Sequence, residues 1–268
     1  MRAAHAPSER RPIGVANWKM YLGTVESLRA AESIRALASR LARRIDVVVC
    51  PSFPLLPQIR EVLARSRILL GAQDVHAEER GPFTGDVSAE HVRSFVRFVI
   101  VGHSERRAHH GETDETIAKK VERVLKAGMH PIVCVGETAE ERDAGETIKK
   151  VRTQVATILQ GLPVLELPRI LFAYEPVWAI SAGLGEPSQK PEPGEVAEVV
   201  GLIRKVASDL GERRYAQQMR VLYGGSVTAK TVRPFVSEPG VDGALIGGAS
   251  TKPAEFIAIV KEILACRS

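Results

Sequence analysis

The sequence predicts an α/β fold in which eight strand–helix units close into a single-domain (β/α)8 barrel. Short apolar runs alternate with longer amphipathic segments along almost the whole chain of 268 residues, which is the rhythm of repeated βα units. The strand candidates are apolar on both faces, as strands are in a parallel sheet covered by helices. There are eight similar units, and this number favours a closed barrel over the alternative, an open doubly wound sheet.

The first unit pairs a strand over residues 14–18 with an amphipathic helix over about 25–41. The later strands are expected at residues 46–50, 68–73, 98–102, 130–135, 170–174, 221–223 and 243–246. The helices that follow them are expected near residues 55–65, 88–95, 114–127, 148–160, 193–208, 232–236 and 253–265. Because each strand precedes a crossover helix, neighbouring strands should run parallel.

The composition is that of one globular domain with a sizeable core. Apolar residues make up 44% of the chain and charged residues 26%, a typical balance for such a domain. No long Ser/Gly/Pro linker divides the chain, so we expect a barrel over residues 12–268 after a flexible tail over residues 1–11. No stretch reaches the roughly 20 apolar residues of a membrane span, and the polar N-terminus lacks a secretory signal. A cytoplasmic protein without membrane contact is expected.

The charge balance favours a small anionic partner over nucleic acid. Lys and Arg outnumber Asp and Glu by 37 to 32, giving a net charge of +5. This excess is dispersed, and aromatic residues make up only 5% of the chain, so the basic stripe and stacking platforms of nucleic-acid-binding proteins are absent. A small anion needs only a local positive site.

The three cysteines are expected to be reduced thiols. They are odd in number and far apart, and Cys50 and Cys134 lie in apolar, strand-like runs, unlike Cys266. Buried thiols in the core are therefore favoured over a disulfide framework. The His and Cys residues also lack metal-ligand spacing, so no metal is predicted.

Polar residues follow four of the predicted strands, in the segments AxNWKM, IVGHSERR, AYEPVW and LYGGSV. The carboxyl ends of barrel strands converge on one mouth, which would bring together Glu175, His103, Lys19 and Asn17. A carboxylate, an imidazole, an ammonium and an amide in one pocket suit proton abstraction next to a carbonyl. Taken singly, each has an ordinary structural explanation, and their joint occurrence at strand ends favours a catalytic site.

Two glycine-rich turns indicate a phosphate site. Gly224-Gly225-Ser226 and Gly247-Gly248 each follow a strand in the last two βα units. Loops at this position of a barrel frequently bind phosphate through backbone N–H groups and a helix N-terminus. The substrate is therefore expected to carry a phosphate group.

These motifs, in this order and spacing, resemble the successive signatures of the triosephosphate isomerase family. They are NWKM at 17–20, VGHSERR at 101–107, CVGET at 134–138, AYEPVWAI at 173–180, YGGSV at 223–227 and GGAS at 247–250, and the likeness runs from residue 14 to the C-terminus. The resemblance implies a TIM barrel that interconverts dihydroxyacetone phosphate and D-glyceraldehyde 3-phosphate, in glycolysis and gluconeogenesis. An isomerase of a four-carbon ketose phosphate and a catalytically silent phosphate-binding scaffold remain alternatives.

The resemblance also implies a role for each site residue. Glu175 is the base that shuttles the proton, His103 the neutral electrophile, Lys19 the cationic anchor, Asn17 a positioning amide and Glu105 a supporting carboxylate near Lys19. The phosphate is expected on backbone groups of Ser181, Ser226, Gly247 and Gly248. No metal or organic cofactor is needed, because the proton leaves one carbon and returns to its neighbour.

Two further segments matter for assembly and for closure of the site. The segment GPFTGD at 81–86 resembles the family's interlocking loop, which implies a homodimer in which Thr84 enters the partner's site near Asn17 and His103.

The family's lid usually reads AIGTGK, whereas this chain reads AISAGLGEPSQKPEP and is about five residues longer. Ala182 and Leu184 replace the usual Thr and Lys, so the lid over residues 181–192 is expected to alter rate or substrate preference.

Overall fold

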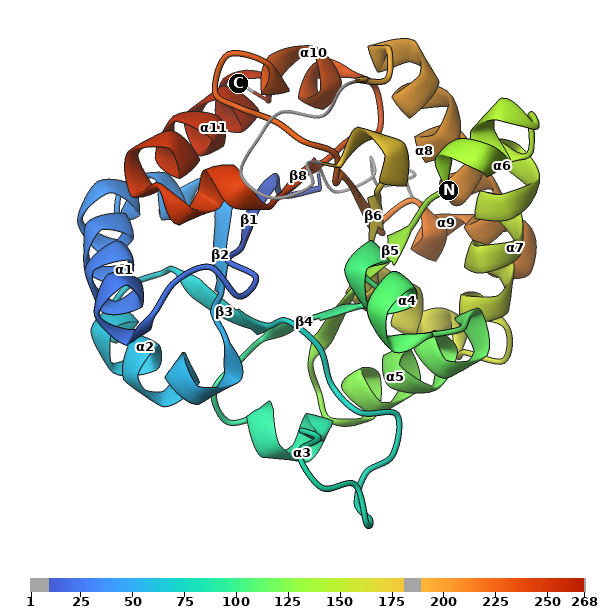
Figure 1. Cartoon of the computed structure of the whole chain (residues 1–268). Helices are drawn as coiled ribbons and strands as arrows, with labels where there is room; N and C mark the ends of the chain where they lie inside the picture. Colours follow the sequence, from blue (N-terminus) through green and yellow to red (C-terminus); the bar gives the residue numbers. More distant parts are fainter. Residues whose placement is uncertain (1–9, 181–188, 268) are drawn as a thin grey trace, which may run out of the picture.

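Eight parallel strands close into a barrel with helices on its outside (Figure 1). The computed structural model describes residues 10–180 and 189–267 of the chain. The strands are β1 (Ile13–Asn17), β2 (Asp46–Cys50), β3 (Leu69–Ala72), β4 (Phe98–Val101), β5 (His130–Val135), β6 (Leu171–Tyr174), β7 (Arg220–Tyr223) and β8 (Gly243–Ile246). They pair in sequence order, and β8 pairs with β1, with Ile13 opposite Gly243. The expected closed barrel is confirmed.

The helices cover the barrel and also occupy several of the loops. The α-helices are α1 (Thr24–Ala38), α2 (Leu56–Leu63), α3 (Ala89–Val92), α4 (Ser104–His110), α5 (Asp114–Lys126), α6 (Ala139–Asp143), α7 (Thr147–Leu159), α8 (Pro193–Leu210), α9 (Arg213–Ala216), α10 (Val232–Ser237) and α11 (Pro253–Ala265). Short 3-10 turns are η1 (Leu41–Arg43), η2 (Phe53–Leu55), η3 (Val164–Arg169), η4 (Val177–Ala179) and η5 (Gly248–Thr251). In the described part of the chain, no helix is long and apolar enough to cross a membrane.

The core has two layers, set by the alternation of side chains along each strand. One layer fills the barrel interior with residues such as Val15, Ile100 and Leu245. The other packs the outward-facing strand residues against the helices, as when α5 buries Ile117 and Val121 on one face. This spacing of four residues is the amphipathic pattern that predicted the helix. A core on both sides of every strand explains why the strands read as continuous apolar runs.

The structure adds helices that the sequence pattern did not indicate. The helix α4 is short and polar, with the sequence SERRAHH, and so lacks the apolar stripe by which helices were predicted. The helix expected near residues 88–95 is limited to Ala89–Val92. The segment between β3 and α3 projects away from the body of the barrel, coloured teal in Figure 1.

The first described residues are bound to the amino-terminal end of the barrel. Arg10 Nε lies 2.8 Å from Asp242 Oδ1, and Arg11 Nε lies 2.6 Å from Asp46 Oδ1. Asp242 directly precedes β8, and Asp46 is the first residue of β2. The two arginines therefore tie the first described residues to the beginnings of the strands on both sides of β1.

Candidate active site

A pocket of about 220 Å³ opens at the carboxyl ends of the strands. Its walls include four of the side chains that the sequence placed at strand ends: Asn17, Lys19, His103 and Glu175. The glycine-rich turns after β7 and β8 also line this pocket. The topology of the barrel thus brings together Asn17 and Glu175, which lie 158 positions apart in the sequence.

Glu175 follows β6 directly and is 2% exposed. One carboxylate oxygen, Oε2, accepts a hydrogen bond from the backbone N–H of Ser104 at 3.3 Å. The other, Oε1, lies 3.4 Å from His103 Nε2. Its backbone N–H donates to Val135 O at 2.8 Å, which fixes the chain as it leaves the strand. A buried carboxylate with two defined neighbours is well placed to act as a general base.

His103 has one ring nitrogen committed to the backbone. Its Nδ1 accepts a hydrogen bond from the N–H of Glu105 at 3.2 Å, where His103 caps the amino-terminal end of α4. An acceptor nitrogen carries no proton, so in the neutral ring the hydrogen lies on Nε2. That hydrogen points toward the pocket side occupied by Glu175 Oε1. The imidazole is therefore arranged as a neutral hydrogen-bond donor.

Lys19 has a left-handed backbone, with φ at +49°, which is costly for a residue with a side chain. Three contacts hold it in this conformation. Asn17 Oδ1 accepts the Lys19 N–H at 3.1 Å, and the Lys19 carbonyl accepts Gln73 Nε2 at 2.8 Å and Ser52 Oγ at 3.3 Å. The strained turn aims the ammonium into the pocket, and Gln73 is a supporting residue that the sequence analysis did not single out.

Glu105 is the carboxylate partner of that ammonium. Its Oε1 lies 2.5 Å from Lys19 Nζ, and its Oε2 lies 3.7 Å from His103 Nδ1. The side chain of Glu105 is 43% exposed, whereas that of Lys19 is 11% exposed. The expected position of Glu105 beside Lys19 is what the structure shows.

The glycine-rich turns present free backbone donors to the pocket. Within the described residues, the N–H groups of Gly247 and Gly248 donate to no acceptor. The N–H of Ser226 is occupied, because it donates to Ala179 O at 3.1 Å. Ser181, the other residue expected to bind phosphate, lies outside the described residues. Two of the four expected backbone donors are thus open in this structure.

Glycine at position 224 is required by the space around the base. A Cβ at Gly224 would lie 2.5 Å from Cγ of Glu175 and 3.2 Å from the carbonyl oxygen of Tyr174. Both distances are below ordinary van der Waals contact. The turn after β7 therefore packs directly against the base, and this role of Gly224 was not visible in the sequence.

The segment that follows Glu175 is anchored by a buried carboxylate. Glu137 is 1% exposed and accepts hydrogen bonds from Tyr174 Oη at 3.1 Å and Trp178 Nε1 at 2.8 Å. Burial raises the pKa of Glu137, although the hydrogen bond from Trp178 opposes the rise. Arg142 stacks on the Trp178 ring at 3.8 Å from its centroid. The backbone on both sides of the base is therefore held by side chains.

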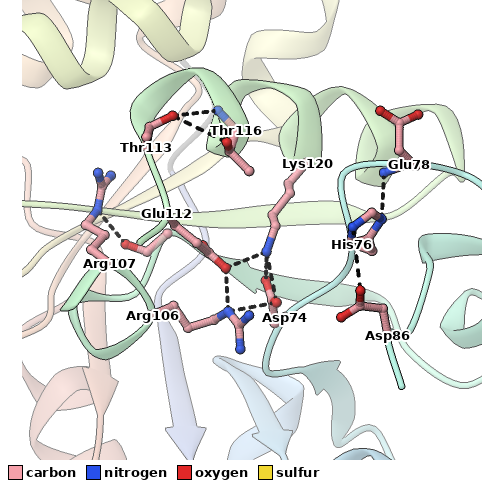
Figure 2. A network of polar contacts seen from close by, with 11 residues as sticks. Asp74, His76, Glu78, Asp86, Arg106, Arg107, Glu112, Thr113, Thr116 and Lys120 are labelled. Carbon is pink, nitrogen blue, oxygen red and sulfur yellow. Dashed lines mark hydrogen bonds and ion pairs between the residues drawn. The ribbon is translucent and has the colours of Figure 1, made fainter. Parts of the chain in front are cut away.

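A buried ion cluster contacts α4 through Arg106 (Figure 2). Lys120 Nζ lies 2.7 Å from Asp74 Oδ1 and 2.6 Å from Glu112 Oε1, and Arg106 of α4 contacts both carboxylates. Burial raises the pKa of Asp74 despite the nearby Lys120 ammonium. Burial would also raise the pKa of Glu112, but hydrogen bonds from Lys120 and Arg106 outweigh it and lower that pKa.

The same helix is tied to the barrel by a second arginine. Arg107 donates to the carbonyl oxygens of Gly102 at 2.8 Å and Cys134 at 3.2 Å, and to Asp114 Oδ1 at 2.6 Å. These bonds connect α4 to β4, β5 and the start of α5. Because α4 carries the groups that bind His103 and Glu175, its anchors also position the pocket.

The three cysteines are unpaired in the structure. Cys50, Cys134 and Cys266 are free thiols, and the first two are buried, as predicted. Burial raises the pKa of Cys50 and of Cys134. Among the described residues, no group of three or more His, Cys, Asp or Glu side chains is arranged to hold a metal ion.

Comparison with known proteins gives one consistent result. The family model described as triosephosphate isomerase matches residues 12–263. Among curated relatives, the triosephosphate isomerase of Carboxydothermus hydrogenoformans is 44% identical over 94% of this chain and 98% of its own length. The triosephosphate isomerases of Cupriavidus necator and Rubrobacter xylanophilus are 43% and 39% identical, over 93% and 94% of this chain and 98% and 97% of their own lengths.

Proposed function

The chain belongs to the triosephosphate isomerase family, and on this premise we infer that Glu175, His103 and Lys19 interconvert dihydroxyacetone phosphate and D-glyceraldehyde 3-phosphate. The enzyme is an intramolecular aldose–ketose isomerase. The observation that supports these roles is the contact of the Glu175 carboxylate with the Nε2 side of a His103 ring whose Nδ1 is already an acceptor. A base and a neutral proton donor thus share one pocket.

In this proposal Glu175 removes a proton from C1 of dihydroxyacetone phosphate. The electron pair of that C–H bond forms the C1–C2 double bond, and the carbonyl oxygen on C2 becomes an enediolate oxygen. The proton then returns from Glu175 to C2, while His103 transfers the hydroxyl proton of O1 to O2. The product is the aldehyde, and no atom or electron is gained from outside the substrate and the protein.

Stabilisation of the enediolate is the main energetic demand, because a carboxylate is a weak base toward a carbon acid. His103 Nε2–H and the Lys19 ammonium supply fixed donors for the developing negative charge. One preorganised donor of this kind is worth roughly 3 kcal/mol. Asn17 adds an amide: its Oδ1 accepts the Lys19 N–H, and within the described residues its NH2 group donates to no acceptor.

We assign phosphate binding to the turns after β7 and β8. The open N–H groups of Gly247 and Gly248 support this assignment, as does the proximity of Lys19, whose Cε would lie 3.3 Å from a Cβ at Gly247. Ser181 is proposed to contribute a further backbone donor, and Ser226 is proposed to do so only when its N–H leaves Ala179 O. The enzyme's place in glycolysis and gluconeogenesis also leads us to propose a cytoplasmic location.

Replacement of Glu175 by Gln tests the role of the base. The amide keeps size and polarity but cannot accept the proton, so turnover and exchange of the carbon-bound hydrogen with deuterated water should fall by about two to four powers of ten. Binding of inorganic phosphate, measured by calorimetry, should persist. Glu61→Gln, an exposed carboxylate on α2, is the matched control.

The outcomes of this experiment separate the roles. Exchange near the wild-type rate in Glu175→Gln would exclude Glu175 as the base. A coupled assay of the wild type with dihydroxyacetone phosphate and with a four-carbon ketose phosphate measures the substrate preference. No exchange with any small sugar phosphate would contradict the isomerase function itself.

We further propose a homodimer in which Thr84 enters the partner's site. The loop around Thr84 belongs to the segment that projects from the barrel in Figure 1. Its neighbour Phe83 is 39% exposed, and Met20 and Tyr21, which follow the anchor lysine, are 93% and 36% exposed. Large apolar side chains exposed on a projecting loop and next to the anchor lysine favour a protein interface.

Light scattering coupled to gel filtration tests the dimer. The wild type should elute with twice the mass of one chain, and Phe83→Glu should shift it to a monomer of reduced activity, because burying an unpaired carboxylate is costly. Leu210→Glu changes an exposed leucine of α8 and serves as the control. A wild-type monomer that stays fully active at nanomolar concentration would contradict the proposal.

A further inference from the structure

A second lysine lines the active-site pocket on the side of the glycine-rich turns. Lys252 borders the same cavity of about 220 Å³ as Lys19, and it shares that wall with Gly247 and Gly248. Its side chain is exposed at the rim. Neither the strand-end pattern nor the family resemblance pointed to this residue, because it follows the short turn η5 rather than a strand.

The charges around the pocket make Lys252 different from Lys19. The Lys19 ammonium is compensated by Glu105 at 2.5 Å. Within the described residues, Lys252 forms no ion pair and no side-chain hydrogen bond. Glu255 also lines the pocket, but its Oε1 is used by the Ala229 N–H at 2.7 Å. Glu255 keeps its negative charge but forms no ion pair with Lys252, so among the described residues that line the pocket Lys252 is the lysine without an ion-pair partner.

The backbone of Lys252 is fixed although its side chain is free. Its N–H donates to Ala249 O at 3.3 Å, and its carbonyl accepts the N–H of Phe256 at 3.0 Å. It ends η5, which begins at Gly248, and it caps α11. The open amide of Gly248 and the root of the Lys252 side chain thus belong to one hydrogen-bonded turn. A ligand held by that amide would therefore bind at the turn from which the Lys252 side chain extends.

We propose that Lys252 is a substrate-binding residue that recognises the outer oxygens of the substrate phosphate. This inference rests on the proposed function. A phosphate monoester carries nearly two negative charges at pH 7, whereas backbone amides supply only partial charges. A flexible lysine at the rim can supply the missing full charge and can attract the anion before it is seated. Its effect falls on binding and capture, since it is not among the groups proposed to contact the reacting carbons.

Lys252→Gln tests this role, with Lys261→Gln on the same helix as the control. Lys261 is also exposed on α11 but does not border the pocket. In Lys252→Gln, we expect KM and the inhibition constant for inorganic phosphate to rise about 3- to 10-fold, in the range of a partly exposed ion pair. The kcat should stay within about twofold, and kcat/KM should depend less steeply on ionic strength. Lys252→Arg should restore both constants.

Two results would overturn the proposal. One is a Lys252→Gln enzyme whose KM and phosphate inhibition constant equal those of wild type and of Lys261→Gln. The other is a fall in kcat with both constants unchanged, which would place Lys252 in the chemistry rather than in binding. Calorimetric titration with inorganic phosphate needs no turnover. A wild type that binds phosphate through Lys252 yet does not isomerise would refute the proposed function and leave this inference standing.

Discussion

Replacement of Gly224 by Ala should damage catalysis without unfolding the barrel. The added methyl group would lie 2.5 Å from Cγ of Glu175, and an ordinary carbon–carbon contact needs about 3.5 Å. The base must therefore move by about 1 Å, since the carbonyl of Tyr174 at 3.2 Å leaves little room on the other side. A displacement of this size costs about 10²-fold in rate. The phosphate-binding amides of Gly247 and Gly248 are untouched, so KM should change much less.

Steady-state kinetics in a coupled assay, with thermal unfolding in parallel, measures both effects. Gly201→Ala is the matched control, because a Cβ there meets nothing within 4 Å in the middle of α8. Alanine suits a helix interior better than glycine, so this control should keep wild-type kinetics and gain about 2 °C in Tm. A Gly224→Ala enzyme with wild-type kcat would refute the argument that the turn after β7 positions Glu175.

Three further substitutions test separate parts of the structure. Lys19→Met should raise KM and lower kcat together, because it removes the charge that faces both phosphate and enediolate, and near-normal kinetics would exclude it as the anchor. His130→Asn should make the free energy of unfolding less dependent on pH under acidic conditions. Burial and nearby arginines lower the pKa of His130 to about 4 from 6.5, so the stability linked to the neutral ring is complete above pH 6.5 and is lost toward pH 4. Urea unfolding at pH 7 and pH 5 should show that the free energy of unfolding falls by about 1–2 kcal/mol less in the variant than in the wild type, after allowance for the partial exposure of His130. An equal fall in the two proteins would contradict this. Glu112→Gln should lower the free energy of unfolding by about 3 kcal/mol, because it breaks the buried ion pair with Lys120. The control Glu122→Gln, at an exposed ion pair, should leave that free energy almost unchanged. Equal Tm values for the two variants would refute the importance of the cluster.

The strands and most helices could be predicted because the apolar residues that they bury recur at regular spacing in the sequence. The strand at Asp46–Cys50 is apolar over both faces, and α11 shows a strong apolar stripe, so both were predicted with their observed bounds. The helix α4 was not predicted, because SERRAHH has no apolar periodicity. It is held by the ion pair of Arg106 with Asp74 and by the hydrogen bond of Arg107 to the carbonyl oxygen of Cys134, both of which reach distant parts of the chain, and such contacts leave no local signal.

The residues of the site also divide into those that the sequence could predict and those that it could not. Barrel topology makes the carboxyl ends of strands converge, so Glu175 and His103 could be placed in one pocket from the sequence. The Ser104 N–H on Glu175 could not, because a backbone donor has no identity in the sequence. Gln73 and Lys252 act on the site from a loop and from a helix cap. Their relevance depends on the three-dimensional course of the chain rather than on spacing along it.

The pairing of β1 with β8 has a consequence for the order of events during synthesis. Ile13 lies opposite Gly243, so the last hydrogen-bonded seam joins segments from the two extremes of the polypeptide. Until β8 has left the ribosome, β1 and β7 are both unpaired sheet edges, and such edges promote aggregation. Closure of a loop this long is also slow compared with local contacts. A nascent chain truncated before residue 243 should therefore depend on chaperones and form intermolecular sheet contacts, whereas release of the final strand removes both edges at once.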